Sequence, residues 1–324
     1  MNLFGKLLSK LDGLHYPQEY LCFAKEGFEQ PLYAYIVAGD KIIKDITNDH
    51  LFTGYSPLVF ALHTLPEDPT LSDEIEMIYA MHSMQANELF EKKDALARLS
   101  LKLIKKQPVD GIVIHYYEGK YGEHRFLPAV QQKIIQLYNR MYNKKPGNIF
   151  LPGNLYTQVQ IAYAMPRIIS LITVEENGLY NLFPTDLHGP LNQKFYICSL
   201  RHEGRACRQV QDAGKIVISQ VNADSYKTVY SLGKNHMQDL KPKENFPISD
   251  ARSAVFGLPL PAAALLYREL ELTDSFIHGI HKFLLFRIAS NHRVKDDRAT
   301  LAHVHNCYAT WRFNNELSSN FLLR

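Results

Sequence analysis

The sequence predicts an α+β protein of two domains, a smaller α+β domain over residues 1–150 and a strand-rich domain over residues 151–324. A domain typically has about 150 residues, so a chain of 324 residues is long enough for two. Helical and extended patterns alternate in the first half of the chain. Three short apolar runs, rich in β-branched or aromatic residues and bounded by turn residues, dominate the second half.

The first domain is expected to begin with a β-hairpin. Residues 33–37 and 41–46 have strand composition and flank the turn Ala38-Gly39-Asp40, and residues 58–62 form a further short strand after a Ser-Pro turn. From Ser72 to about Lys106 we expect a long helix. Ser72 would be its N-cap, followed by acidic residues that favour a helix N-terminus.

The rest of the first domain is expected to contain a strand and a second helix. Residues 111–117 predict the strand, and Glu118–Gly122 predicts a turn after it. Pro128 opens the helix at its first position, and its charged end at residues 144–147 is the predicted domain boundary. The apolar positions of this helix predict its buried face, which comprises Val130, Ile134, Leu137, Tyr138 and Met141.

The two halves of the chain show a weak internal similarity, which we call the internal echo. Residues 31–63 and 166–202 share an order of strand, glycine turn and further strands, with Thr47-Asn-Asp-His50 in one half and Thr185-Asp-Leu-His188 in the other. A true repeat would make the first half a diverged relative of the second. Because short β-meanders commonly share such punctuation, we attribute the echo to chance.

The second domain is expected to be built on strands at 168–174, 194–200 and 215–221. Asn177-Gly178 predicts a hairpin turn, because this dipeptide tolerates positive φ angles. The segment 181–190 predicts a long polar connection, where a site would lie. Residues 262–272 and 282–289 predict paired strands, and residues 301–313 predict a final strand.

Composition excludes several function classes. The formal net charge of +3 gives no basis for a large nucleic-acid surface. The four cysteines form no C-x-x-C pair, which argues against a zinc ribbon and leads us to expect a reducing, cytoplasmic location. The amphipathic start of the chain is expected to be neither a signal peptide nor a membrane span, and no G-x-G-x-x-G fingerprint or Walker A sequence is present.

The order of motifs in the second half resembles the flavin reductase-like family of FMN-binding split β-barrels, over roughly residues 155–312. The matching elements are Pro166-Arg167, Asn181-Leu-Phe-Pro184, Ser199-Leu-Arg201 and a Gly-x-His element at Gly279–His281. The resemblance implies an α+β chain whose C-terminal half is a split β-barrel. It also implies FMN as the cofactor, a nicotinamide nucleotide as the electron donor and a homodimer with the flavin at the subunit interface.

The resemblance also implies which residues meet the flavin. Arginine forks suit phosphate, and three arginines follow the strand at 194–200 within eight residues, at 201, 205 and 208. No catalytic residue is assigned, because the cofactor supplies the hydride chemistry. The cofactor-binding residues implied are Asn181, Thr185, Asp186, Leu187, His188, Ser199, Leu200, Arg201, Arg205 and Cys207.

Two alternatives stay open. Ala206-Cys207 stands where the family has Asp-Thr, which favours a flavin-binding module without catalysis. Haem binding through one of the clustered histidines, such as His281 or His303, is the other. His303-x-His305 would place two imidazoles on one strand face, but no carboxylate or cysteine has matching ligand spacing, so no metal site is predicted.

Overall fold

The computed structural model describes residues 14–16, 18–25, 32–142, 149–296 and 299–317, and most of their regular structure is strand. The chain divides into two compact units, which we call unit 1 and unit 2. Unit 1 comprises Met1–Leu21, Glu29–Met165 and Val304–Ser319; unit 2 comprises Cys22–Phe28, Pro166–His303 and Asn320–Arg324. The amphipathic N-terminal segment and the predicted boundary at 144–147 lie outside the described residues. Within the described part, no helix is long and apolar enough to cross a membrane.

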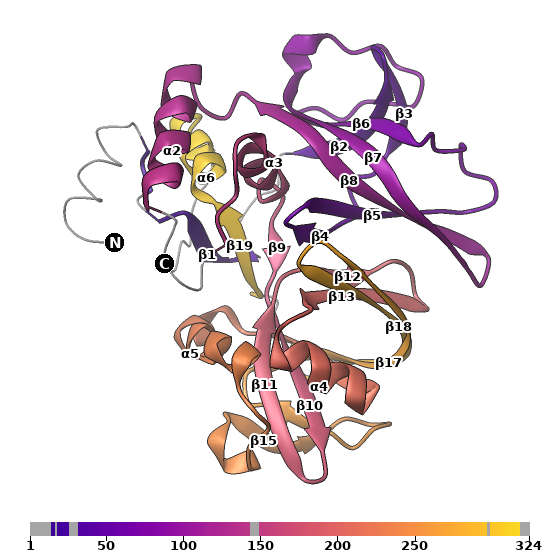
Figure 1. The fold of residues 1–324 in the computed structure, drawn as a ribbon, viewed down its shortest axis with the longest axis vertical. Helices are drawn as coiled ribbons and strands as arrows, with labels where there is room; N and C mark the ends of the chain where they lie inside the picture. Colours follow the sequence, from indigo (N-terminus) through magenta and orange to yellow (C-terminus); the bar gives the residue numbers. More distant parts are fainter. Residues whose placement is uncertain (1–13, 17, 26–31, 143–148, 297–298, 318–324) are drawn as a thin grey trace. The chain divides into compact units, whose positions relative to one another are not determined.

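Unit 1 is built on an antiparallel sheet with the strand order β3-β2-β6-β7-β8-β5-β4 (Figure 1). Its strands are β2 (Tyr33–Ala38), β3 (Lys41–Asp45), β4 (His50–Tyr55), β5 (Leu58–Thr64), β6 (Glu74–Ala80), β7 (Ala95–Val109) and β8 (Ile112–His124). A 3-10 turn, η2 (Lys92–Asp94), precedes β7. The helices of this unit are α2 (Ala129–Tyr142), α3 (Asn154–Ala162) and α6 (Asn306–Asn314).

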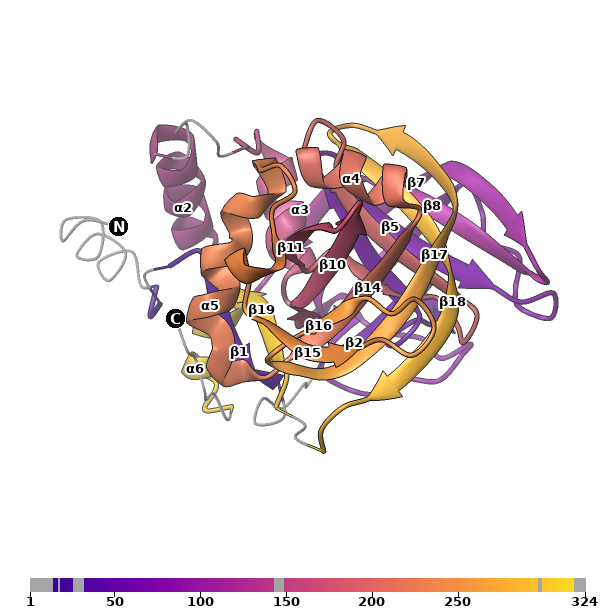
Figure 2. The ribbon, with the colours of Figure 1, turned by 90° about the horizontal axis from the view of Figure 1, so that it is seen from below.

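Unit 2 contains a second antiparallel sheet, with the order β11-β10-β14-β17-β18-β13-β12. In Figure 2 the long hairpin of β17 and β18 curves around the shorter strands β10 and β14. The strands are β10 (Ser170–Glu176), β11 (Leu179–Thr185), β12 (His188–Pro190), β13 (Phe195–Arg201), β14 (Lys215–Val221), β17 (Ala264–His278) and β18 (His281–Arg293). Helix α4 (Arg205–Ala213) joins β13 to β14 and packs Ala206, Cys207 and Val210 into the core of this sheet.

Short elements fill the long connection between β14 and β17. They are η3 (Ala223–Ser225), α5 (Tyr226–Ser231), η4 (Leu232–Met237), η5 (Lys243–Asn245) and the paired strands β15 (Ile248–Arg252) and β16 (Pro259–Pro261). A three-stranded sheet has the order β1-β19-β9, with bounds Tyr20–Ala24, Leu301–His305 and Arg167–Ile168.

The two seven-stranded sheets have the same topology. If β2 to β8 are matched in chain order with β10 to β14, β17 and β18, the two strand orders are identical. The internal echo in the sequence, attributed above to chance, therefore has a structural counterpart. His50 opens β4 and pairs with Leu62, just as His188 opens β12 and pairs with Cys198.

Several predicted strands are confirmed. The predicted strand at 215–221 is β14, and Asn177-Gly178 turns β10 into β11 with φ angles of 53° and 77°. The hairpin around Gly39 is present. Residues 264–272 of the predicted strand 262–272 lie in β17, and residues 282–289 lie in its partner β18. The helix after Pro128 is also present as α2.

The long helix predicted from Ser72 to Lys106 is wrong, because this segment forms strands β6 and β7. Ala95, Ala97, Leu99 and Leu101 are buried and alternate with less buried residues, which is the period of a strand. The leucines also fit a helical spacing, which misled the prediction. Ser72 is not a helix cap: its hydroxyl donates to the carbonyl oxygen of Glu74 at 2.5 Å.

The predicted buried face of α2 is also wrong. Val130, Leu137 and Met141 are 70%, 57% and 60% exposed, whereas Ile135 and Asn139 are buried. The amide of Asn139 donates to the carbonyl oxygen of Leu151 at 3.2 Å, so a polar residue anchors this helix.

Three further element predictions need correction. The turn predicted at Glu118–Gly122 is part of β8, which continues to His124. The polar connection predicted from residue 181 begins as β11, an edge strand in which Pro184 is tolerated because one side needs no partner. The final strand ends at His305, whose side chain accepts from Cys307 N and caps α6, a helix with Cys307, Tyr308 and Trp311 buried.

Helix α3 packs on β8 through two glycines. A β-carbon at Gly119 would lie 2.1 Å from Gln158 Oε1 and 2.8 Å from Leu58 Cδ2, and one at Gly122 would lie 3.0 Å from Gln158 Cγ. The side chain of Asn154 also exchanges two 2.7 Å hydrogen bonds with the backbone of Gly122. The helix can approach the strand this closely only because both positions lack side chains.

Gly119→Ala is therefore expected to destabilise the protein by roughly 1–3 kcal/mol, because the packed side chains of Gln158 on α3 and Leu58 on β5 must move to admit the methyl group. Urea unfolding measures the loss. Gly233→Ala is the matched control, since its β-carbon would meet no atom within 4 Å. Equal stability of the two variants would contradict the close packing of α3 on β8.

Candidate functional site

Two segments that the sequence places apart meet at one edge of unit 2. Strand β12 pairs with β13, with His188 opposite Cys198. One residue earlier, Ser199 N donates to the carbonyl oxygen of Leu187 at 2.9 Å. The connection Thr185–His188 therefore lies beside the end of β13, where Ser199, Leu200 and Arg201 are located.

Asp186, in the two-residue connection between β11 and β12, anchors a polar chain. Its Oδ2 lies 2.9 Å from His303 Nδ1, and both side chains are mostly buried. Because a carboxylate only accepts, His303 donates from Nδ1 and its Nε2 accepts from the Tyr230 hydroxyl, with which it is hydrogen-bonded. Asp186, His303 and Tyr230 thus form a chain that runs from a carboxylate to a phenol.

His188 is held between two partners. Its Nε2 lies 3.0 Å from the carbonyl oxygen of Ile168, which can only accept, so Nε2 carries the hydrogen. Its Nδ1 therefore accepts from the Tyr196 hydroxyl at 2.6 Å. Burial lowers the pKa of His188 to about 4, with Arg268 acting in the same direction and Asp186 opposing. His188 is thus a neutral imidazole at pH 7.

His281 and His236 both lie close enough to the Asp186 carboxylate to be affected by its charge. His281 lies opposite Arg201 in the β13/β18 pair, and its Nδ1 is 3.2 Å from Ser199 Oγ. Burial and then Arg201 lower the pKa of His281 to about 3, while Asp186 raises it. His236 bonds the carbonyl oxygen of Pro184 at 2.7 Å, and its pKa is lowered by burial and Arg201 against the pull of Asp186.

The arginines predicted for phosphate binding lie around the start of α4. Arg201 is an exposed residue at the end of β13, three residues before Gly204, the N-cap residue of α4, where no side chain caps the helix. Arg205 pairs with Asp239, and Arg208 pairs with Asp212 at 3.4 Å, both as exposed ion pairs. Arg201 and the first turn of α4 are therefore the cationic part of this edge.

The remaining predicted residues turn away from that edge or are buried beneath it. Asn181 donates to Gln209 Oε1 at 2.7 Å and to the carbonyl oxygen of Asn235, which ties β11 to α4 and η4. Leu200 and Cys207 pack in the core, and burial raises the pKa of the Cys207 thiol to about 11. Thr185 and Leu187 are buried.

Sequence reasoning did not assign Tyr230 or His236 to the site. Both lie in the long connection between β14 and β17, where no periodicity points toward β11. His281 and His303 were considered only as haem or metal ligands. Among the described residues, no group of three or more His, Cys, Asp or Glu side chains is arranged to hold a metal ion.

Unit 1 contains cavities at two places on the β7/β8 hairpin. One, of about 170 Å³, is lined by the adjacent ends of β7 and β8 with Arg98, Glu123 and Arg125. The other, of about 440 Å³, lies beside the β7/β8 turn and is lined by residues that include Leu65, Pro108 and Ile112.

No protein-family model matches the chain, and no curated protein matches it. Solved structures do. An FMN-binding protein from Thermus thermophilus matches with 18% identity and a TM-score of 0.36, over 40% of this chain and 72% of its own. A flavin reductase of styrene monooxygenase from Pseudomonas putida matches with 16% identity and a TM-score of 0.37, over 43% and 88%. An NADH:FAD oxidoreductase from Streptomyces globisporus matches with 12% identity and a TM-score of 0.41, over 50% and 96%.

These neighbours are flavin reductases and FMN-binding proteins, consistent with the family that the sequence resembles. Their identities are below 20% and their TM-scores below 0.5. What the chain binds must therefore be argued from its own residues.

The buried histidines predict a pH-dependent stability. The unfolded His281 protonates near pH 6.5, whereas the folded one protonates near pH 3, so the unfolded state binds more protons between these values. The free energy of unfolding should therefore fall as the pH falls from 6.5 toward 3, by up to about 1.4 kcal/mol per pH unit for one proton.

His281→Asn should flatten this slope by about one proton, measured by urea unfolding at several pH values. His82→Asn, at an exposed position, is the control and should leave the slope unchanged. An unaltered slope in His281→Asn would show that this imidazole is not kept neutral by the fold.

Proposed function

We propose that unit 2 binds FMN and that the protein is a flavin-dependent oxidoreductase. The observation that carries the proposal is the meeting of the connection Thr185–His188 with the end of β13 and the start of α4. These are the segments that the family resemblance assigns to the flavin ring and phosphate, and the Ser199 N to Leu187 O bond joins them.

The residues present fit the phosphate of FMN. An uncapped helix N-terminus directs backbone N–H groups and the positive end of the helix dipole toward an anion. Only residues 202–204 separate β13 from the first turn of α4, and Arg201 is the last residue of β13. Arg205 can add a second guanidinium, because its partner Asp239 is exposed and an exposed ion pair contributes little.

The chain of Asp186, His303 and Tyr230 would serve the proton balance of a reduction. FMN, when bound, supplies hydride transfer. The product of such a reduction needs a proton as well as the hydride. A His303 imidazolium, stabilised by Asp186, would give its Nε2 proton to the Tyr230 oxygen as the Tyr230 hydroxyl gives its own proton to the product, which leaves His303 neutral.

The finer features of the proposal follow from the resemblance. Unit 2 would be a split β-barrel, the electron donor would be NADH or NADPH, and the protein would be a homodimer. A reducing, cytoplasmic location is supported by the four cysteines, which are all buried thiols outside any disulfide. The Thr that the family places near the phosphate is Cys207 here. Because Cys207 packs in the core, the phosphate would depend on Arg201 and backbone N–H groups.

A flavin-binding module without turnover is the second candidate, and the missing Asp-Thr favours it. Haem binding through His303 is less well supported, since both of its ring nitrogens are already hydrogen-bonded. Oxidation of NADH or NADPH in the presence of FMN distinguishes an enzyme from a carrier.

The binding of FMN is tested by isothermal titration calorimetry on the full chain. We expect saturable binding. Arg201→Ala should weaken it by about tenfold to a hundredfold, in line with the 1.5–3 kcal/mol of a hydrogen bond to a charged group. Riboflavin, which lacks the phosphate, should bind equally to the wild type and to Arg201→Ala.

Arg140→Ala, at an exposed position on α2, is the control and should bind FMN like the wild type. An absence of FMN binding by the folded wild-type protein would reject the proposed function. Equal losses of FMN and riboflavin affinity in Arg201→Ala would reject the assignment of Arg201 to the phosphate.

A further inference from the structure

The likeness between the two units extends to individual strand pairs. The β7/β8 and β17/β18 hairpins each contain twelve paired positions, and every pair of one hairpin corresponds to a pair of the other 169 residues later. Ser100↔Tyr121 corresponds to Glu269↔Ser290, for example (269 − 100 and 290 − 121 are both 169). Both irregularities recur at the same places, between Ser100/Leu101 and Glu269/Leu270, and between Leu103/Lys105 and Leu272/Asp274. Two unrelated hairpins would not share two bulges in register.

The neighbouring strands follow the same correspondence. Lys102 pairs with Glu74 at one end of the β6/β7 ladder, with a charge contact of 3.9 Å. Glu271 pairs with Lys215 at the same end of β14/β17, with a contact of 3.8 Å. The acidic and basic residues have exchanged strands, but an ion pair is present at the equivalent position of both units. This is the pattern expected of two diverged copies of one ancestral domain.

The correspondence also identifies the residues of unit 1 that are equivalent to the candidate phosphate site of unit 2. In unit 2, the pair Arg201↔His281 closes the β13/β18 ladder just before the two-residue turn of β17/β18. The ladder of β5/β8 places Leu65 and Ile112 at the same positions, one step beyond Thr64↔Val113. The arginine and histidine of unit 2 thus correspond to two apolar residues in unit 1.

The connection that follows has also changed. Between β13 and β14, unit 2 has helix α4 with Arg205 and Arg208. Between β5 and β6, unit 1 has Leu65–Asp73, which contains no lysine or arginine, three acidic residues and two prolines. The described structure assigns no helix to this segment. It therefore offers neither a guanidinium nor a helix N-terminus to a phosphate.

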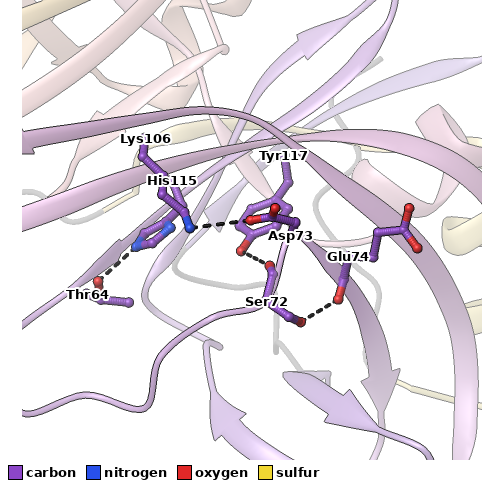
Figure 3. Close-up of polar contacts among 7 residues, drawn as sticks. All are labelled: Thr64, Ser72, Asp73, Glu74, Lys106, His115 and Tyr117. Carbon is purple, nitrogen blue, oxygen red and sulfur yellow. Dashed lines mark hydrogen bonds and ion pairs between the residues drawn. The ribbon is translucent and has the colours of Figure 1, made fainter.

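Polar contacts fix this acidic connection in place. The Lys106 ammonium donates to Asp73 Oδ1 at 3.3 Å, and the Tyr117 hydroxyl donates to the carbonyl oxygen of Ser72 at 2.8 Å. Figure 3 shows these two contacts side by side. Asp68 pairs with Lys44 at 2.6 Å. Two lysines near this connection thus already neutralise carboxylates of the chain itself.

We propose that the chain is an internal duplication in which only unit 2 keeps an anion-binding site, so that one chain binds one phosphorylated flavin. The proposal rests on the proposed function for the identity of the ligand. Unit 1 keeps the fold of a binding domain but has an acidic, apolar edge where unit 2 has a cationic one.

The test is the stoichiometry of FMN binding to the full chain by isothermal titration calorimetry, with the mass of the protein measured by light scattering. We expect one FMN per chain. The double variant Arg201→Ala with Arg205→Ala should lose this binding by at least tenfold while it unfolds at an unchanged temperature. The matched variant in unit 1, Leu65→Ala, should bind one FMN with wild-type affinity.

Two FMN per chain, or one per two chains, would overturn the inference while leaving the proposed function standing. So would a single site that Leu65→Ala weakens and the double arginine variant does not. No binding at all would reject the proposed function instead. In that case the inference is tested with inorganic phosphate, whose binding should be weakened by the double variant alone, and any other result would overturn it.

Discussion

The register of the two long hairpins is the constraint on which both units depend. A strand presents alternate residues to opposite faces, so a slip of one residue would exchange its core and solvent faces. The two bulges in each hairpin reset this alternation at fixed points. At the first bulge of unit 2, buried Glu269 accepts from the backbone N–H groups of Val255 and Phe256 and from the Ser290 hydroxyl, which holds the neighbouring loop against the sheet.

The candidate site depends on the same register. The end of the β13/β18 ladder sets His281 opposite Arg201, and the short β12/β13 ladder brings the connection with Asp186 alongside. The histidines near Asp186 with lowered pKa values, at positions 188, 236 and 281, are neutral at pH 7 and leave its charge in place. The carboxylate can therefore polarise His303, the imidazole to which it is directly bonded.

Sequence reasoning succeeded where one pattern had one meaning. Residues 215–221 are apolar and β-branched, and Asn177-Gly178 suits only a turn, so β14 and the β10–β11 hairpin were predicted correctly. It failed where a segment fitted two periods, as in β7, whose leucines satisfy both helical and strand spacing. The partners of Asp186 could not be predicted, because Tyr230 and His303 are distant in sequence and only the fold brings them together.

The sequence showed the internal similarity of residues 31–63 and 166–202 but could not separate a repeat from chance, since register and topology are kept while side chains are not. The glycines under α3 show how far the copies have diverged. By the correspondence of the hairpins, Gly119 and Gly122 match Ile288 and Asn291. Side chains at these two positions would occupy the space that α3 takes on β8, so a helix cannot pack in this way on β18. Unit 1 therefore covers with its own helix a sheet face that unit 2 cannot cover in the same manner. The two copies therefore differ at two places, the edge that the proposal assigns to an anion in unit 2 and the sheet face that α3 covers in unit 1.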